Sequence, residues 1–288
     1  SASTISRELK RNSSGTYHPE HAQISYHKRL IKKNKRSSIT ALIEKYIRSK
    51  LKLDWSPEQI AGRIRIDKGL GIHHETIYRF IYSNKANNGR LYLHLRHKNK
   101  KYHKRTQQYQ RRGTIKNRVC ISTRPKIVDR KSRIGDWEID TVIGANHQGA
   151  LVTIVDRKSK FSLITKVNSK HADVVTQATI DLLYPLRRLT HTITSDNGKE
   201  FAYHEVIAKT LDTSFYFANP FHSWERGLNE HTNGLIRQYI PKKSEFANIS
   251  KEEIVTIANK LNHRPRKSLG YKTPFEVFMN AFLKKMSA

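Results

Sequence analysis

The sequence has one cysteine, Cys120, among its 288 residues. A single cysteine forms neither an internal disulfide nor a thiolate zinc cluster, so a disulfide-stabilised secreted fold and a zinc finger are both excluded. This cysteine usage suits a reducing compartment. The chain also lacks any run of 18 apolar residues and any signal-peptide pattern, so neither a membrane span nor export is predicted.

Acidic residues are scarce: 24 Asp and Glu stand against 55 Lys and Arg, which gives a net charge of +31. Such an excess repels itself unless a polyanion neutralises it, and nucleic acid is the first candidate. The charge is uneven, with a net +24 on residues 1–130 and +7 on residues 131–288. We therefore expect residues 1–130 to bind nucleic acid and residues 131–288 to carry a function that needs acidic side chains. The length predicts two or three domains.

Residues 3–11 form a short amphipathic pattern. Ile5 and Leu9 lie at helical spacing, while Arg7, Lys10 and Arg11 occupy the remaining surface. This predicts a helix that packs on one side and faces phosphate on the other, with a plain basic helix as the alternative. The chain opens inside this pattern without an initiator Met, from which we expect an N-terminal piece to be missing.

A stronger helical unit begins at Ser56, which is followed by a proline at the first helical position and by Gln59 at the third. A turn at 69–71 containing two glycines leads to a second helix with Ile77, Phe80 and Ile81 at helical spacing. Helix, short turn and helix is the helix-turn-helix plan, whose second helix enters the major groove. An αα-hairpin without a DNA role is the alternative. The candidate DNA contacts are His74, Glu75, Thr76, Tyr78 and Arg79.

Residues 85–130 hold 15 Lys or Arg and a single acid, Asp129. Apolar periodicity is weak there, so we predict a linker or arm that follows the DNA backbone. A merely solvated charged face is the alternative.

The pattern changes at residue 136 to β-branched runs broken by glycines. Three consecutive strands predict an antiparallel meander, and the following alternation of strands and helices predicts a mixed α/β sheet. The expected strands are 136–143, 150–157, 161–167, 191–196 and 213–218, and the expected helices are 173–186, 198–211 and 223–240.

Several carboxylates are placed for metal chemistry. Asp196 ends a strand, where open sheets bind ligands. Asp136, Glu138 and Asp140 share one strand face, so spacing does not choose among them. The helix at 223–240 carries further acids, Glu225 and Glu230, about 140° apart, so only one of them points into a given site. Carboxylates that converge suit Mg2+, and two such ions activate the attacking oxygen and stabilise the leaving oxygen in phosphodiester chemistry.

Three motifs carry a resemblance that selects among these acids. W-E-I-D-T at 137–141, T-S-D-N-G-K-E-F at 194–201 and E-H-T-N-G-L-I-R at 230–237 resemble the first-, second- and third-acid motifs of retroviral-type integrases and related transposases. The resemblance implies Asp140, Asp196 and Glu230 as catalytic residues and metal ligands. Asn233 and Arg237 follow Glu230 at i+3 and i+7, on the same helix face, so we expect them and Lys199 to position phosphate.

Nearly the whole chain resembles the transposases of the insertion-sequence-30 family, through S-T-I-S-R-E-L-K-R-N, W-S-P-E-Q-I-A-G-R, H-E-T-I-Y-R-F-I-Y and L-N-H-R-P-R-K-S-L-G-Y. Two departures are visible. His73 stands where a small N-capping residue is expected, a loss of roughly 1 kcal/mol at most, and Ile139 replaces a smaller residue beside Asp140.

The resemblance implies an RNase H-like catalytic core, a mixed five-stranded sheet with flanking helices, preceded by an all-α helix-turn-helix region. The expected segments are a remnant of a first helix-turn-helix with a basic helical region (1–50), a second helix-turn-helix (51–84), a basic arm (85–130) and the integrase-type catalytic domain with C-terminal helices (131–288).

The implied function is a bacterial transposase, cytoplasmic and associated with the nucleoid. It would bind double-stranded DNA at terminal inverted repeats and in the target, and would bridge DNA ends as a homo-oligomer. Cleavage and strand transfer would depend on Mg2+, for which Mn2+ can substitute. The alternatives are a catalytically inactive DNA-binding regulator and an RNase H-like nuclease that cuts without joining.

Overall fold

The computed structural model describes residues 1–12, 16–32, 38–97, 115–220 and 222–287. By their contacts they form two compact units, Ser1–Glu44 and Lys45–Ala288, each described here by itself. None of the helices described is both long and apolar enough to cross a membrane.

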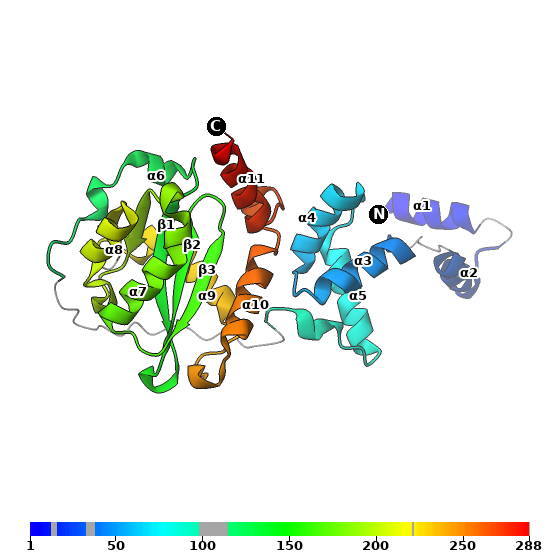
Figure 1. Ribbon diagram of the computed structural model, residues 1–288. Helices are drawn as coiled ribbons and strands as arrows, with labels where there is room; N and C mark the ends of the chain where they lie inside the picture. The colour runs from blue at the N-terminus through cyan, green and yellow to red at the C-terminus, as the bar shows by residue number, and fades with distance from the viewer. Residues whose placement is uncertain (13–15, 33–37, 98–114, 221, 288) are drawn as a thin grey trace. The chain divides into compact units, whose positions relative to one another are not determined.

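The first unit contains α1 (Ala2–Arg11) and α2 (Pro19–Lys32), labelled in Figure 1. The helix predicted near residues 3–11 is confirmed, but its predicted packing is wrong: Ile5 and Leu9 are 62% and 47% exposed, and no residue of α1 is buried. A helix of 10 residues in so small a unit has too little apolar surface facing it to enclose its stripe. The predicted DNA contacts Arg7, Lys10 and Arg11 are all exposed.

The helix-turn-helix region comprises α4 (Pro57–Lys68) and α5 (His74–Ala86), preceded by α3 (Ala41–Leu51). The predicted capping box is confirmed, because Ser56 Oγ accepts from Gln59 N at 3.3 Å and Ser56 N donates to Gln59 Oε1 at 2.9 Å. Gly69 ends α4 with φ 66°. At the start of α5, His73 Nδ1 accepts from Glu75 N at 3.3 Å, so histidine caps this helix with its ring.

Isoleucines hold these two helices together. Ile60 and Ile64 of α4 and Ile77 and Ile81 of α5 are all fully buried, as the apolar spacing predicts. Complete burial of one such side chain stabilises the fold by roughly 1.5 to 3 kcal/mol. The opposite face of α5 stays accessible.

Helix α4 also packs closely on the start of α11 (Pro274–Met286) and on the segment before it. The Arg63 guanidinium donates twice to the Glu276 carboxylate, at 2.7 and 2.6 Å, and once to the Tyr271 carbonyl at 3.3 Å. A Cβ built on Gly62 would meet Tyr271 ring atoms at 2.3 Å. Glycine is therefore required at residue 62 by this close approach.

We expect Gly62→Ala to lower the free energy of unfolding by about 1 to 3 kcal/mol, because the added methyl group overpacks against Tyr271. In an exposed helix, a change from glycine to alanine would raise the free energy of unfolding by about 1 kcal/mol. The sign of the measured change therefore shows whether residue 62 is packed against Tyr271. Urea unfolding followed by circular dichroism measures it. The control is Gly71→Ala, where an added Cβ meets nothing within 4 Å. A stabilising effect of Gly62→Ala would show that the two segments do not pack as described.

The second unit is built on a five-stranded sheet in the order β3-β2-β1-β4-β5, shown edge-on in Figure 1. The first three strands pair antiparallel, as the predicted meander requires, while β4 pairs parallel with both β1 and β5. This mixed sheet with flanking helices has the RNase H-like fold. The strands are β1 (Asp136–Ile143), β2 (Ala150–Asp156), β3 (Ser162–Val167), β4 (Thr192–Ser195) and β5 (Ser214–Phe217).

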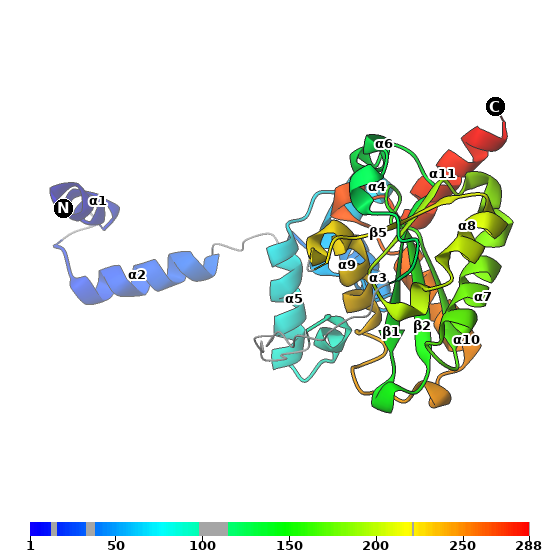
Figure 2. The same cartoon turned by 90° about the vertical axis from the view of Figure 1, so that its left-hand side faces the viewer.

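Helices cover both faces of the sheet (Figures 1 and 2). On one face, Trp137 and Ile139 of β1 belong to a core with residues of α7 (Ala172–Leu183) and α8 (His204–Leu211). On the other, Val142 and Leu151 pack with α9 (Gly227–Ile236) and α10 (Lys251–Asn262). Because side chains alternate along a strand, Asp136, Glu138 and Asp140 face the α9 side, away from Trp137 and Ile139.

Two predicted helices are interrupted. The predicted helix at 223–240 is a 3-10 turn followed by α9, which ends at Ile236, and the one at 198–211 is a 3-10 turn followed by α8. Helices α8 and α9 therefore start later than their patterns predict. The 3-10 turns are η1 (Leu91–His94), η2 (Ile121–Thr123), η3 (Ala145–His147), η4 (Tyr184–Leu189), η5 (Lys199–Phe201), η6 (Ser223–Arg226), η7 (Phe246–Asn248) and η8 (Lys267–Leu269).

The predicted basic arm is partly built into the catalytic unit. Residues 98–114 lie outside the described residues. After them, Cys120 forms a bridge with Phe217 of β5, whose N donates to the Val119 carbonyl at 2.9 Å. Helix α6 (Lys126–Arg130) follows, and the preceding Arg124 is only 7% exposed. The last part of the arm therefore extends the sheet edge.

Candidate active site

The register of the sheet brings Asp140 and Asp196 together. Strands β1 and β4 pair Glu138 with Thr194, so two residues further along Asp140 lies beside Asp196, just beyond the end of β4. Both carboxylates are 19% exposed. The Arg226 guanidinium lies between them, 3.7 Å from Asp140 Oδ1 and 3.4 Å from Asp196 Oδ2. Two of the three predicted acids thus share one site.

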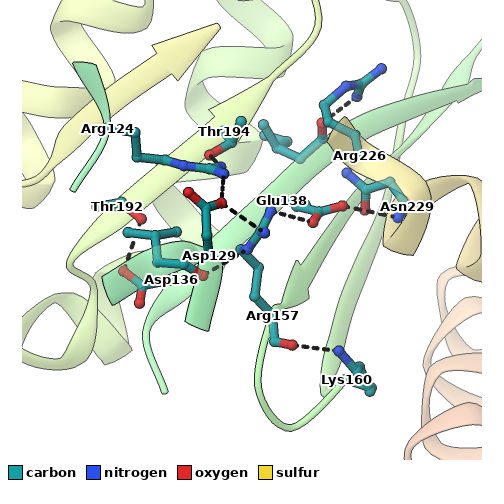
Figure 3. A network of polar contacts seen from close by, with 12 residues as sticks. Arg124, Asp129, Asp136, Glu138, Arg157, Lys160, Thr192, Thr194, Arg226 and Asn229 are labelled. Atoms are coloured by element: carbon teal, nitrogen blue, oxygen red, sulfur yellow. Dashed lines mark hydrogen bonds and ion pairs between the residues drawn. The ribbon is translucent and has the colours of Figure 1, made fainter. Parts of the chain in front are cut away.

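The other two acids of β1 are committed to the interior, as Figure 3 shows. Asp136 is fully buried and accepts from Thr192 Oγ1 at 2.9 Å. Glu138 is 2% exposed, and its carboxylate binds Arg157 Nη1 at 2.7 Å. Of the three acids on this strand face, only Asp140 is left with an accessible carboxylate.

Hydrogen bonds hold the accessible pair in place. Asp140 Oδ1 accepts from Thr141 N and Oδ2 from Asn233 Nδ2, both at 2.9 Å. Asn233 is itself oriented by Thr153 Oγ1, which donates to Asn233 Oδ1 at 3.1 Å. Asp196 Oδ1 accepts from Gly198 N at 2.9 Å. Asn233, which the sequence placed on the same helix face as Glu230, therefore orients the first acid.

The surroundings of Asp140 disfavour its charged form. Burial raises the pKa of Asp140, Arg226 lowers it, and the Asp196 and Glu200 carboxylates raise it, which together give a pKa of about 6. Glu200 accepts from Thr141 Oγ1 at 3.0 Å. Sequence reasoning missed the roles of Glu200, which stands inside the motif at 194–201, and of Arg226, which lies four residues before Glu230.

The candidates for the third acid, Glu225 and Glu230, lie in and just before α9. The Glu225 carboxylate is engaged, because Asn219 donates to it from N at 2.8 Å and from Nδ2 at 2.9 Å. This favours Glu230, which is exposed on α9 one turn before Asn233. Among the residues that the structure describes, however, no group of three or more His, Cys, Asp or Glu side chains is arranged to hold a metal ion. Glu230 as third ligand stays a prediction.

Comparisons with known proteins agree with this geometry. Residues 131–223 match the integrase core domain family. The chain is 48% identical over 279 residues to the transposase for insertion sequence element IS4351 of Bacteroides fragilis, covering 96% of this chain and 86% of that protein. It is 37% identical over 289 residues to transposase InsI for insertion sequence element IS30A of Escherichia coli strain K12, covering 96% and 75%. The chain belongs to the IS30 family of transposases.

It is therefore a transposase with an integrase-type catalytic core. Among solved structures, the catalytic core domain of BIV integrase gives a TM-score of 0.41 at 18% identity, covering 53% of this chain and 98% of that one. Transposases with an integrase core act on DNA and generally use a divalent metal ion.

The remaining predicted DNA contacts of the transposase lie either near the acids or on α5. Near the acids, Lys199 is exposed on η5, whereas Arg237 donates to the main-chain carbonyls of Pro241 at 3.1 Å and Ile143 at 2.9 Å. On α5, Glu75 and Arg79 are exposed, and the side chains that are partly exposed are His74, Thr76 and Tyr78. Their contacts with DNA stay predictions.

Arg226 makes one property of the transposase site testable. We expect Arg226→Gln to raise the pKa of Asp140 above about 6, because the favourable interaction with the guanidinium charge is lost. Carboxyl carbon NMR of the metal-free protein, titrated between pH 4 and 9, measures it. The exposed Arg187→Gln is the matched control and should leave the titration unchanged. If Arg226→Gln leaves it unchanged too, the guanidinium does not act on Asp140 in solution.

Proposed function

We propose that this transposase binds the terminal inverted repeats of an insertion sequence and catalyses Mg2+-dependent cleavage and strand transfer, with Mn2+ able to substitute. Asp140, Asp196 and Glu230 are the proposed catalytic residues and metal ligands. The observation that supports this most directly is the Asp140–Asp196 pair, which the parallel register of β1 and β4 brings to an accessible position.

The donor set fits a hard divalent cation. Asp140 and Asp196 offer carboxylate oxygens, the ligands that Mg2+ prefers. The raised pKa of Asp140 reflects burial together with the neighbouring Asp196 and Glu200 charges, which a cation would offset. When bound, metal ions would supply activation of the attacking oxygen and neutralise charge on the phosphate.

The chain's own side chains supply orientation and charge balance. Asn233 and the Thr141 amide fix the two oxygens of Asp140, and Gly198 N fixes one oxygen of Asp196. Arg226, which also donates to the Ile139 carbonyl at 3.1 Å, holds a positive charge next to both acids. A DNA phosphate entering here meets that guanidinium.

Binding of the repeats is assigned to the helical regions. The exposed Arg7, Lys10 and Arg11 of α1 are proposed to contact phosphates, and the accessible face of α5 is proposed to enter the major groove. Lys199 and Arg237 are proposed to contact the strand near the acids. The protein is further proposed to bridge two DNA ends as a homo-oligomer and to work with the nucleoid in the bacterial cytoplasm.

One assay tests the function. The protein is incubated with end-labelled terminal repeats, a target plasmid and Mg2+, with EDTA in a parallel reaction. We expect joined product only in the Mg2+ reaction. Cleavage without joining would instead identify a nuclease, and a retarded band without either product would identify a DNA-binding regulator.

A further inference from the structure

A second basic site lies in a cavity of 520 Å3 that shares helix α9 with the active site. Its walls come from the segment around α4, from the stretch after η1, from α9 and from the turn between α10 and α11. Four cationic side chains line it: Arg96, Arg264, Arg266 and Lys267. Cavities of this size hold small ligands or part of a larger one.

The side chains of the three arginines donate hydrogen bonds only to neutral groups. Arg264 donates to Gln238 Oε1 at 3.1 Å and to the Tyr239 hydroxyl at 2.8 Å. Arg96 and Arg266 donate to main-chain carbonyls, those of Gly234 at 3.1 Å and Leu261 at 3.0 Å. Within the described part of the chain, no carboxylate lies within ion-pair distance of any of the three, and the buried Nε atoms of Arg264 and Arg266 have no acceptor.

The two acids that line the cavity are already engaged. Asp54 Oδ2 accepts from Lys260 Nζ at 3.1 Å, and Asp54 Oδ1 lies 3.5 Å from His94 Nδ1. Glu58 Oε1 accepts from Lys267 Nζ at 2.7 Å. The ion pairs of these two acids are therefore made with Lys260 and Lys267, and not with the three arginines.

Like charges lie close to the Arg266 guanidinium. Burial lowers the pKa of Arg266, the neighbouring Arg264 and Arg96 charges act in the same direction, and together they bring it to about 10. Holding the buried Arg264 and the half-buried Arg266 cations next to each other is unfavourable unless an anion completes the site, and the flat guanidinium groups match phosphate oxygens.

The cavity and the active site use different faces of α9. His231 and Leu235, four residues apart, line the cavity, whereas Asn233 contacts Asp140. Two residues along an α-helix correspond to about 200° around its axis. An anion in the cavity is therefore held on one side of α9, while the reacting phosphate belongs to the other.

We propose that this cavity binds a backbone phosphate of the DNA, at a site separate from the acids of the active site, with Arg96 and Arg266 as its principal ligands. The proposal rests on the proposed action on DNA. It requires no base contact, so the site contributes affinity and strand placement without sequence preference.

Ethylation interference tests the proposal, with terminal-repeat DNA and EDTA present so that no chemistry occurs. With the unmodified chain, we expect ethylation of one or two particular phosphates to block DNA binding, because an ethylated phosphate loses the charge that the arginines of the cavity would bind. With Arg266→Gln or Arg96→Gln, interference at those phosphates should disappear while the rest of the pattern persists. The slope of log K against log salt should fall by about one for each variant.

The exposed Arg188→Gln is the matched control and should leave pattern and slope unchanged. Thermal unfolding separates folding from binding: Arg96 is exposed and its variant should keep the melting temperature even if that of the Arg266 variant falls. An unchanged interference pattern in folded Arg96→Gln and Arg266→Gln would overturn the proposal. Failure of the proposed function would instead appear as missing joined product with the interference pattern intact.

Discussion

Asp196→Asn is expected to slow cleavage and strand transfer by about a thousandfold or more, which corresponds to about 4 kcal/mol of transition-state stabilisation. The amide replaces a charged ligand by a neutral one where the Asp140–Asp196 pair is proposed to hold the cations. Binding of terminal-repeat DNA should stay within about threefold, since the change touches no proposed DNA contact. Product formation in a single-turnover assay and a gel-shift titration measure the two quantities.

Asp173→Asn makes the same chemical change on the exposed start of α7 and should leave both quantities unchanged. Joint loss of chemistry and DNA binding in the Asp196 variant would count against its assignment as a metal ligand, because it would indicate a damaged fold. Normal chemistry in that variant would refute the assignment outright.

Arg157→Met is expected to lower the free energy of unfolding by about 3 to 5 kcal/mol, because it leaves the Glu138 carboxylate buried without its cation. The two side chains are 6% and 3% exposed, and their charged atoms lie 2.7 Å apart. Arg157 also lies 3.5 Å from Asp129, which contacts Arg124, so the loss spreads through the network of Figure 3. Urea unfolding measures the change.

Two further variants interpret that result. Arg130→Met removes an exposed charge from the neighbouring α6 and should change the stability by less than about 0.5 kcal/mol. Combining Arg157→Met with Glu138→Leu replaces both charges by apolar groups and should recover much of the loss. Equal destabilisation by the single and the double variant would mean that packing of the arginine stem, and not the ion pair, determines the stability here.

Local pattern was sufficient to predict most of the fold. Alternating β-branched residues located β1, β2 and β3, and the Ser56 and Gln59 capping box located the start of α4. The buried face of α1 was predicted wrongly, because amphipathic spacing shows which side is apolar but not whether another element covers it. The inclusion of residues 119–124 at the sheet edge escaped prediction for a related reason: a bridge from Cys120 to Phe217 has no local signal.

In the active site, too, local pattern predicted which residues share a face, but not which distant segments they contact. Period-two spacing put Asp136, Glu138 and Asp140 on one face but did not rank them, since their partners Thr192, Arg157 and Asn233 come from distant segments. The family resemblance chose Asp140, and the hydrogen bonds give the physical reason. Arg226 could not be assigned from spacing, because its position between two carboxylates depends on the pairing of β1 with β4.

The parallel pairing of β1 with β4 also has a consequence for how the protein is made. The two neighbouring acids come from strands separated by β2, β3 and α7, so they meet only after the ribosome has passed Asp196. The helical segments that are proposed to bind DNA precede both acids in the chain. If these segments bind DNA as proposed, a nascent or prematurely terminated polypeptide can bind DNA before Asp140 and Asp196 have come together.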